Sequence, residues 1–155
     1  MMTAVLVAGP AMAAEAPYIR DGVKAQVTSM FVEGFSKGNF KAVDAVVAPN
    51  FIEHEMMMPN QKAGREGLKQ TIAALRVGFP DLKVQMLDFS YDRGKAFVRY
   101  RMTGTQTGSF MGKPATGKKL DITGFDEIRF RNGLAVEHWG QGDEMTMMKQ
   151  LGMMK

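Results

Sequence analysis

The chain has 155 residues, of which 45% are hydrophobic and 23% are charged, and this length and composition are typical of one globular domain. The formal net charge is +4, but lysine and arginine are scattered along the sequence, so we expect no nucleic-acid partner. Cysteine is absent and histidine occurs only at His54 and His138, which excludes disulfides, thiolate zinc sites and three-histidine metal sites.

The first 16 residues, MMTAVLVAGPAMAAEA, resemble the end of a secretory signal peptide, because a short apolar run is followed by Ala-x-Ala cleavage options. No basic residue precedes the apolar run, so the alternative is an uncleaved tail. The run is too short to span a bilayer, and we expect no membrane partner. We therefore expect one domain over residues 17–155, in a protein that is periplasmic or secreted, or otherwise cytoplasmic.

Three helices are predicted in the first half of the chain. Apolar residues recur at helical spacing from Ile19 to Ser36. Asn39 is a candidate N-cap for a shorter helix that we expect Pro49 to end. A third helix is predicted from Arg65 to Val77, because Gly78-Phe79-Pro80 stops its apolar pattern.

Strand patterns follow the helices and also interrupt them once. The segment from Phe51 to Glu55 is predicted as a short strand with Ile52 and His54 on one face. After residue 81 the apolar residues alternate, which predicts a hairpin that turns at Asp92-Arg93-Gly94 and whose second strand continues to about Met111. A final methionine-rich helix is expected after Asp143, which is a candidate N-cap.

The last hairpin turns at Asn132-Gly133, and its register decides which side chains face inward. A two-residue turn pairs Arg131 with Leu134, and one face then mixes Arg129, Glu127, Val136 and His138, so that it has no clear inside. A bulge at Gly133 instead sorts the faces cleanly, so we predict the bulged register. The side chains that this register turns inward are those of Ile128, Phe130, Leu134 and Val136.

In this register Asp126 faces His138 across the two strands, and the next pair is Gly124 with Gly140. Cross-strand neighbours are close enough for a carboxylate to bind an imidazole, and the two glycines leave a gap where a ligand fits. We therefore take Asp126 and His138 as a candidate acid/base pair. The alternative is a buried polar pair that only ties two strands together.

Two further residues complete the candidate catalytic set. His54 is the second histidine, and it serves as a proton donor if its strand faces the pocket; the alternative is a packing role. Asp143 is a candidate donor as well as an N-cap. In this hypothesis His138, oriented by Asp126, removes a proton next to a carbonyl, and His54 or Asp143 donates to the developing enolate oxygen.

The segments GTQTGSFMGKPATGKKL, GFDEIRFRNGLAVEHWGQGD and KQLG resemble those of SnoaL-like polyketide cyclases, or ester cyclases, of the nuclear transport factor 2-like superfamily. The resemblance covers roughly residues 23–152. It implies an α+β fold in which a curved antiparallel sheet forms a cone-shaped barrel around three N-terminal helices, with a short C-terminal helix. Our element order agrees with that fold.

The resemblance also implies an activity. Family members close a polyketide ester by an intramolecular aldol reaction, without metal or cofactor, with an acidic residue as acid/base. That acidic residue falls at Gly140 here, and the family's pocket histidine falls at Asp126. Gly140 thus leaves space, and we expect Gly140→Asp to gain some cyclase activity.

Three functions remain open from the sequence alone. The first is a cofactor-free cyclase or isomerase, and the second is a non-catalytic protein that binds a small hydrophobic molecule in a methionine-lined pocket. The third is an interaction domain, because Phe125 and Trp139 are predicted on the outer face of the sheet. Aromatic residues are enriched at interfaces, so we expect a homodimer that covers them.

Overall fold

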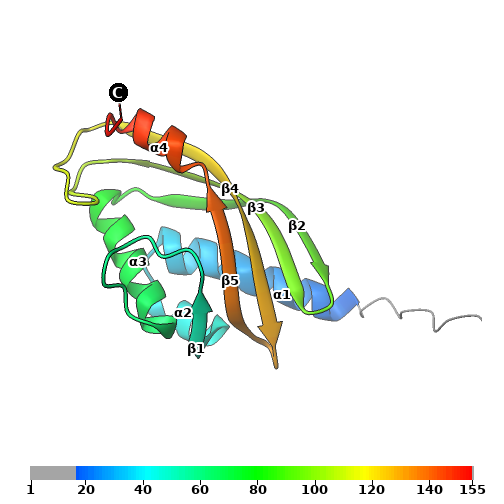
Figure 1. Ribbon diagram of the computed structural model, residues 1–155. Coiled ribbons are helices and arrows are strands. Elements are labelled where there is room, and N and C mark those ends of the chain that lie inside the picture. The colour runs from blue at the N-terminus through cyan, green and yellow to red at the C-terminus, as the bar shows by residue number, and fades with distance from the viewer. Residues whose placement is uncertain (1–16, 155) are drawn as a thin grey trace, which may run out of the picture.

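The computed structural model describes residues 17–154, and the segment that resembles a signal peptide lies outside them. A curved sheet of five strands packs its concave side against the helices, as Figure 1 shows. The strand order is β1-β5-β4-β3-β2, and within the described residues the sheet is open, with edges at β1 and β2. The predicted α+β class is confirmed, with a sheet that curves without closing into a barrel.

The helices follow the apolar patterns of the sequence. The first long helix is regular over α1 (Pro17–Ser29) and continues as a π-helical turn, η1 (Met30–Ser36). The side chain of Asn39 caps the next helix by accepting from the backbone N–H of Lys41. The remaining helices are α2 (Phe40–Val46), α3 (Gly64–Gly78) and α4 (Glu144–Gln150).

The strands form one antiparallel meander with a parallel addition at its edge. Their bounds are β1 (Val47–Glu53), β2 (Lys83–Asp92), β3 (Lys95–Thr105), β4 (Lys119–Arg131) and β5 (Leu134–Gly142). The expectation of a wholly antiparallel sheet is wrong at one place, since β1 runs parallel to β5. Pro49 does not end α2 but lies inside β1, where an edge strand tolerates a residue without an N–H.

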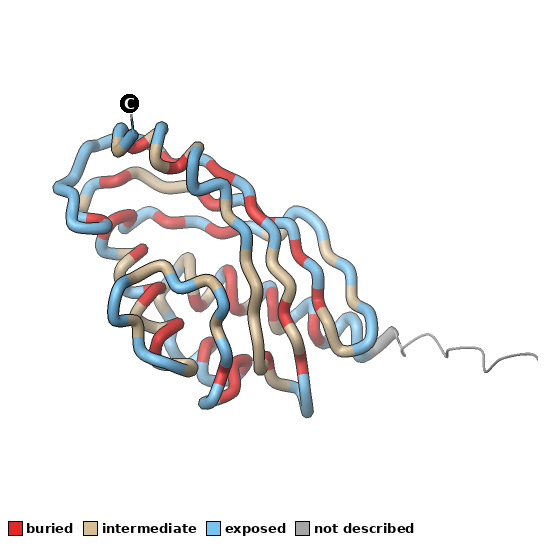
Figure 2. Tube along the Cα trace, in the orientation of Figure 1, coloured by how far each residue is buried: buried red, intermediate tan, exposed pale blue. Residues whose placement is uncertain are grey.

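The core fills the space between sheet and helices, and Figure 2 shows buried positions alternating along the strands. Ile72 and Leu75 of α3 are buried against the sheet side chains, among which Val98 and Leu120 are at most 2% exposed. Burying such apolar side chains is the main force that holds α3 under the sheet.

The predicted register of the last hairpin is wrong. Asn132 and Gly133 form a two-residue turn with φ of 49° and 77°, and Arg131 pairs with Leu134. The register shifts one step later, between the pairs Phe130 with Ala135 and Arg129 with Glu137. This places the bulge in β5 rather than in the turn.

The displaced bulge changes which side chains face inward. Ile128 and Phe130 are buried, as predicted, but Ala135 is buried in place of Leu134 and Val136. The physical reason is that the extra residue in β5 reverses the alternation of inward and outward side chains. Ala135 therefore faces inward before the bulge, and His138 shares the face of Ile128 after it.

The glycine-rich segment after β3 is a loop, so the prediction of a strand to Met111 is wrong. β3 ends at Thr105, and the next side chain, Gln106, is fully buried. Its amide donates to the carbonyl of Pro114 at 3.2 Å and accepts from the Thr116 hydroxyl at 2.7 Å. These bonds hold residues 106–118 as a folded loop beside the end of α3.

Candidate functional site

A largely apolar pocket lies between the sheet and the helices, and one of its sides is polar. Two adjoining cavities, of about 90 and 60 Å³, share walls made by Phe31, Phe35 and Leu68. Both also reach Asp126 and His138. An engineered apolar cavity of about 150 Å³ binds benzene, so each of these cavities alone is smaller than a ring requires, and a single-ring group would have to occupy both across their shared walls.

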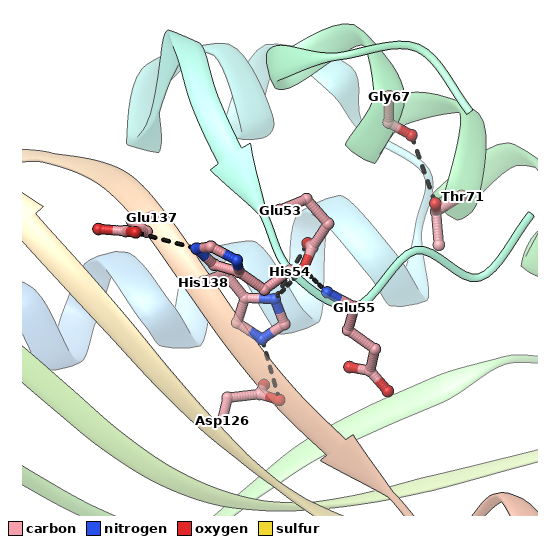
Figure 3. A network of polar contacts seen from close by, with 8 residues as sticks. All are labelled: Glu53, His54, Glu55, Gly67, Thr71, Asp126, Glu137 and His138. Atoms are coloured by element: carbon pink, nitrogen blue, oxygen red, sulfur yellow. Dashed lines mark hydrogen bonds and ion pairs between the residues drawn. The ribbon is translucent and has the colours of Figure 1, made fainter. Parts of the chain in front are cut away.

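His138 lies at the centre of the polar side, between two carboxylates (Figure 3). Its Nδ1 contacts Glu53 Oε1 at 2.8 Å, and its Nε2 lies 3.1 Å from Asp126 Oδ1. The side chains of all three residues are 10–13% exposed. The expected contact between Asp126 and His138 is confirmed, although the two are diagonal neighbours: His138 pairs with Ile128, and Asp126 with Gly140.

The two carboxylates keep His138 charged. Burial alone disfavours the imidazolium, but hydrogen bonds to Asp126 and Glu53 outweigh it and raise the pKa of His138 to about 10. At neutral pH both ring nitrogens therefore carry protons and donate. This geometry makes His138 a buried positive charge that orients carboxylates, in place of the free base expected from the sequence.

Glu55 brings a third carboxylate to the same side of the pocket. Burial raises the pKa of Glu55, and the nearby charge of Asp126 raises it further, against the opposing effect of His138. The backbone N–H of Glu55 donates to Glu53 Oε1 at 2.9 Å. A carboxylate with a raised pKa is a stronger base than an exposed one.

Tyr100 supplies a phenol beside these carboxylates. Its side chain lines the pocket and packs edge-on against Phe31. Burial raises its pKa, and the charges of Asp126 and Glu55 add to the effect. Tyr100 therefore stays protonated and can donate a hydrogen bond to a substrate oxygen.

His54 lies on the outer face of the sheet, so the expectation that it lines the pocket is wrong. Its Nε2 contacts Glu137 Oε1 at 2.9 Å, and its ring stacks on Trp139 at 4.7 Å. Ile52, on the same face, is 52% exposed. The even residues of this strand do share a face, as predicted, but the odd residues Glu53 and Glu55 face the pocket.

Asp143 acts as an N-cap in this structure. Its carboxylate accepts from the backbone N–H of Thr146 at 3.0 Å, and this bond lowers its pKa. The side chain is exposed and does not line the pocket. The structure thus brings together two of the four expected residues, Asp126 and His138, and leaves Asp143 and His54 outside.

The cluster also has the residue types of a metal site. Glu55, Asp126 and His138 each offer one ligand atom, and these atoms lie within 4.8 Å of one another. A metal ligand must be a deprotonated ring nitrogen, however, and the carboxylate contacts of His138 favour protons on both of its nitrogens. The donor set therefore fits proton transfer better than metal binding.

The gap expected beside two glycines is filled from inside the protein. Gly124 pairs with Gly142, and a Cβ at position 124 would lie 2.3 Å from the Tyr100 hydroxyl oxygen. A Cβ at position 140 would lie 1.9 Å from Glu55 Oε2. The glycines thus make room for Tyr100 and Glu55.

Sequence reasoning missed Glu53 and Glu55. The signal was present in the sequence. Glu53 lies two residues after the apolar Phe51 and Glu55 lies four residues after it, so all three share a face if the segment is a strand. Choosing the face of His54 as the inner one hid them.

The fold and this pocket define an α+β domain of the nuclear transport factor 2-like type, with a polar cluster under a curved sheet. Residues 25–151 match the family model "SnoaL-like polyketide cyclase". The chain belongs to the SnoaL-like polyketide cyclase family. No curated protein matches its sequence.

Solved structures agree with this fold. TsrD from Streptomyces laurentii has a TM-score of 0.80 at 24% identity, over 87% of this chain and 98% of its own. A putative SnoaL-like polyketide cyclase from Jannaschia sp. CCS1 has a TM-score of 0.79 at 23% identity, with 91% and 98% covered. IdmH, a putative polyketide cyclase from Streptomyces antibioticus, has a TM-score of 0.70 at 27% identity, with 83% and 97% covered.

Among residues 17–154, no helix has both the length and the apolar character needed to cross a membrane.

Proposed function

We propose that this protein is a cofactor-independent acid–base enzyme, a cyclase or isomerase that acts next to a carbonyl group of a small apolar molecule. The observation that carries the proposal is the buried chain Glu53–His138–Asp126 with Glu55 beside it, at the polar side of an apolar pocket. Membership of a family named for polyketide cyclases supports the same reaction class.

The energetics of the cluster favour catalysis over simple binding. Taking charges out of water costs several kcal/mol per ion, and apolar residues in their place are often neutral or stabilising. A pocket that only holds a lipophilic ligand gains nothing from three carboxylates and an imidazolium. A proton-transfer site needs such groups, because burial and neighbouring charges tune their pKa values.

The proposed reaction balances without an added reagent. A carboxylate of the cluster takes a proton from the carbon next to the carbonyl, and the electron pair moves to the carbonyl oxygen, where Tyr100 donates a hydrogen bond. In a cyclase the enolate carbon then attacks a second carbonyl of the same molecule, and the new alkoxide takes the proton back. In an isomerase the proton returns to a different carbon.

Deuterium exchange tests this class of reaction without knowledge of the natural substrate. Phenylacetone, a ketone with a single ring, is incubated with the protein in D₂O, and NMR follows the loss of its benzylic hydrogens. Wild type should accelerate exchange, Asp126→Asn should be slower, and the outer-face variant His54→Gln should match wild type. No acceleration over an equal amount of heat-unfolded protein would favour the binding-protein alternative.

A further inference from the structure

Position 140 is glycine for a reason that lies outside its own backbone. Gly140 is absent from the residues with positive φ, so its conformation is open to any amino acid. A Cβ there would lie 1.9 Å from Glu55 Oε2 and 2.9 Å from His138 Cε1. What excludes a side chain at 140 is therefore chiefly the carboxylate of Glu55.

Glu55 reaches this space from a different strand. β1 ends at Glu53, and the chain two residues later still presents Glu55 to the pocket (Figure 3). Glu53 ties the two together, since its carboxylate accepts from both the Glu55 backbone N–H and the ring of His138. The carboxylate of Glu55 thus lies beside the imidazolium, where a side chain from β5 would otherwise extend.

We propose that Glu55 is the group that moves the proton at this site, and that Gly140 is the residue that makes room for its carboxylate. This inference rests on the proposed function for its reaction class, but it assigns the proton to one residue. The competing carboxylate, Asp126, is already engaged in an ion pair with the ring of His138, with 3.1 Å between Oδ1 and Nε2. Glu55 has no such ion pair within hydrogen-bonding distance among the described residues.

In the proposed step, a Glu55 carboxylate oxygen takes a proton from the substrate carbon next to the carbonyl. The carbon–hydrogen bond breaks, and its electron pair forms the enolate, with the negative charge on the carbonyl oxygen. The protonated Glu55 then returns the hydrogen to the product. Burial, which raises the pKa of Glu55, helps both halves of the step, because the acid and base forms come closer in free energy at neutral pH.

The expectation that Gly140→Asp gains activity is revised by this geometry. In the wild-type background the new side chain would meet the Glu55 carboxylate and add a further negative charge beside Asp126. A gain is expected only when Glu55 is shortened at the same time. The double variant Glu55→Ala/Gly140→Asp brings a carboxylate back into the same space from β5.

The test uses nitrobenzisoxazole, a planar molecule that opens to a coloured phenolate when a base removes its ring hydrogen. Because this reaction needs a base and no carbonyl chemistry, it isolates the proton-transferring group. Glu55→Gln should lose roughly 100- to 10,000-fold in kcat/KM, the usual contribution of a general base. Glu66→Gln, an exposed carboxylate on α3, is the matched control and should keep the wild-type rate.

Gly140→Ala tests the space while residue 55 remains glutamate. It should lower kcat/KM roughly 10-fold or more, because the Glu55 carboxylate must move away from the new Cβ and the His138 ring, whose Cε1 would lie 2.9 Å from it, must also give way. Gly22→Ala, where a Cβ meets nothing within 4 Å, is the control and should keep the wild-type rate. The double variant should recover part of what Glu55→Ala alone loses.

The outcomes separate this inference from the proposed function. If wild type exchanges phenylacetone and Glu55→Gln keeps the wild-type rate with both probes, the reaction class stands and the assignment to Glu55 is overturned. If nitrobenzisoxazole opens with dependence on Glu55 but phenylacetone does not exchange, the assignment stands and the reaction class fails. A folded Gly140→Ala variant with full activity would overturn the role given to Gly140.

Discussion

Raising the pH from about 6.5 to 10 should destabilise this protein through a single buried histidine. The contacts with Asp126 and Glu53 raise the pKa of His138 to about 10, above the usual value of 6.5. Between these two pH values the folded state holds a proton that the unfolded state has released. The contribution of His138 is therefore fully present below about pH 6.5 and is lost as the pH rises through 10.

The size of the effect follows from the same two values. At about 1.4 kcal/mol for each pH unit, the interval from 6.5 to about 10 corresponds to at most about 5 kcal/mol. A domain of this size has a total stability of roughly 5–15 kcal/mol, so the loss is large enough to measure.

Urea unfolding followed by circular dichroism, at several pH values across this interval, measures the loss. Lysines and tyrosines also titrate near its upper end, so the comparison of interest is with His138→Gln, which should show a much shallower decline. The matched variant His54→Gln should decline as wild type does. A wild-type midpoint that is the same at both ends of the interval, or an NMR titration of His138 centred near 6.5, would refute the reasoning.

Three further results are expected. Glu55→Gln should raise the melting temperature at neutral pH while it removes activity, because a carboxyl whose folded pKa is raised costs stability once ionised; a lower melting temperature contradicts this. Asp143→Ala should lower the free energy of unfolding by about 1 kcal/mol through loss of the N-cap, without slowing phenylacetone exchange; a slower exchange would return Asp143 to the site. We propose that a second copy covers the outer sheet face at Phe125, which is 61% exposed, and at Trp139; light scattering should show a dimer for wild type and a monomer for Phe125→Lys, and a monomeric wild type would contradict it.

The helices were predictable because their information is local. Each helix signal depends only on residues close to it in the sequence. These signals are the apolar spacing of α1 and α3, the cap at Asn39 and the stop after Gly78. The contact between His138 and Asp126 was predictable for a related reason. In the predicted register the two residues are a direct pair on one face. The shift of the bulge makes them diagonal neighbours, but they stay on the same face and in contact.

The position of the bulge and the inner face of β1 were not predictable, because they depend on distant packing. Asn132-Gly133 suits a two-residue turn, and the extra residue lies further along the strand at Val136, between the pairs Phe130 with Ala135 and Arg129 with Glu137. The parallel pairing of β1 with β5 joins segments far apart in sequence, and its pairs Ile52 with Glu137 and Glu53 with His138, which follow a register shift after Val47, decide that Glu53 faces inward.

The most direct test of the central claim is the stereochemistry of deuterium exchange. The two benzylic hydrogens of phenylacetone are equivalent in solution, but one carboxylate fixed at one side of a pocket can reach only one of them. The account predicts that early in the reaction wild type produces monodeuterated phenylacetone enriched in a single enantiomer, and that Glu55→Gln abolishes the enrichment. Equal amounts of both enantiomers from the wild-type protein, formed at the accelerated rate, would contradict it.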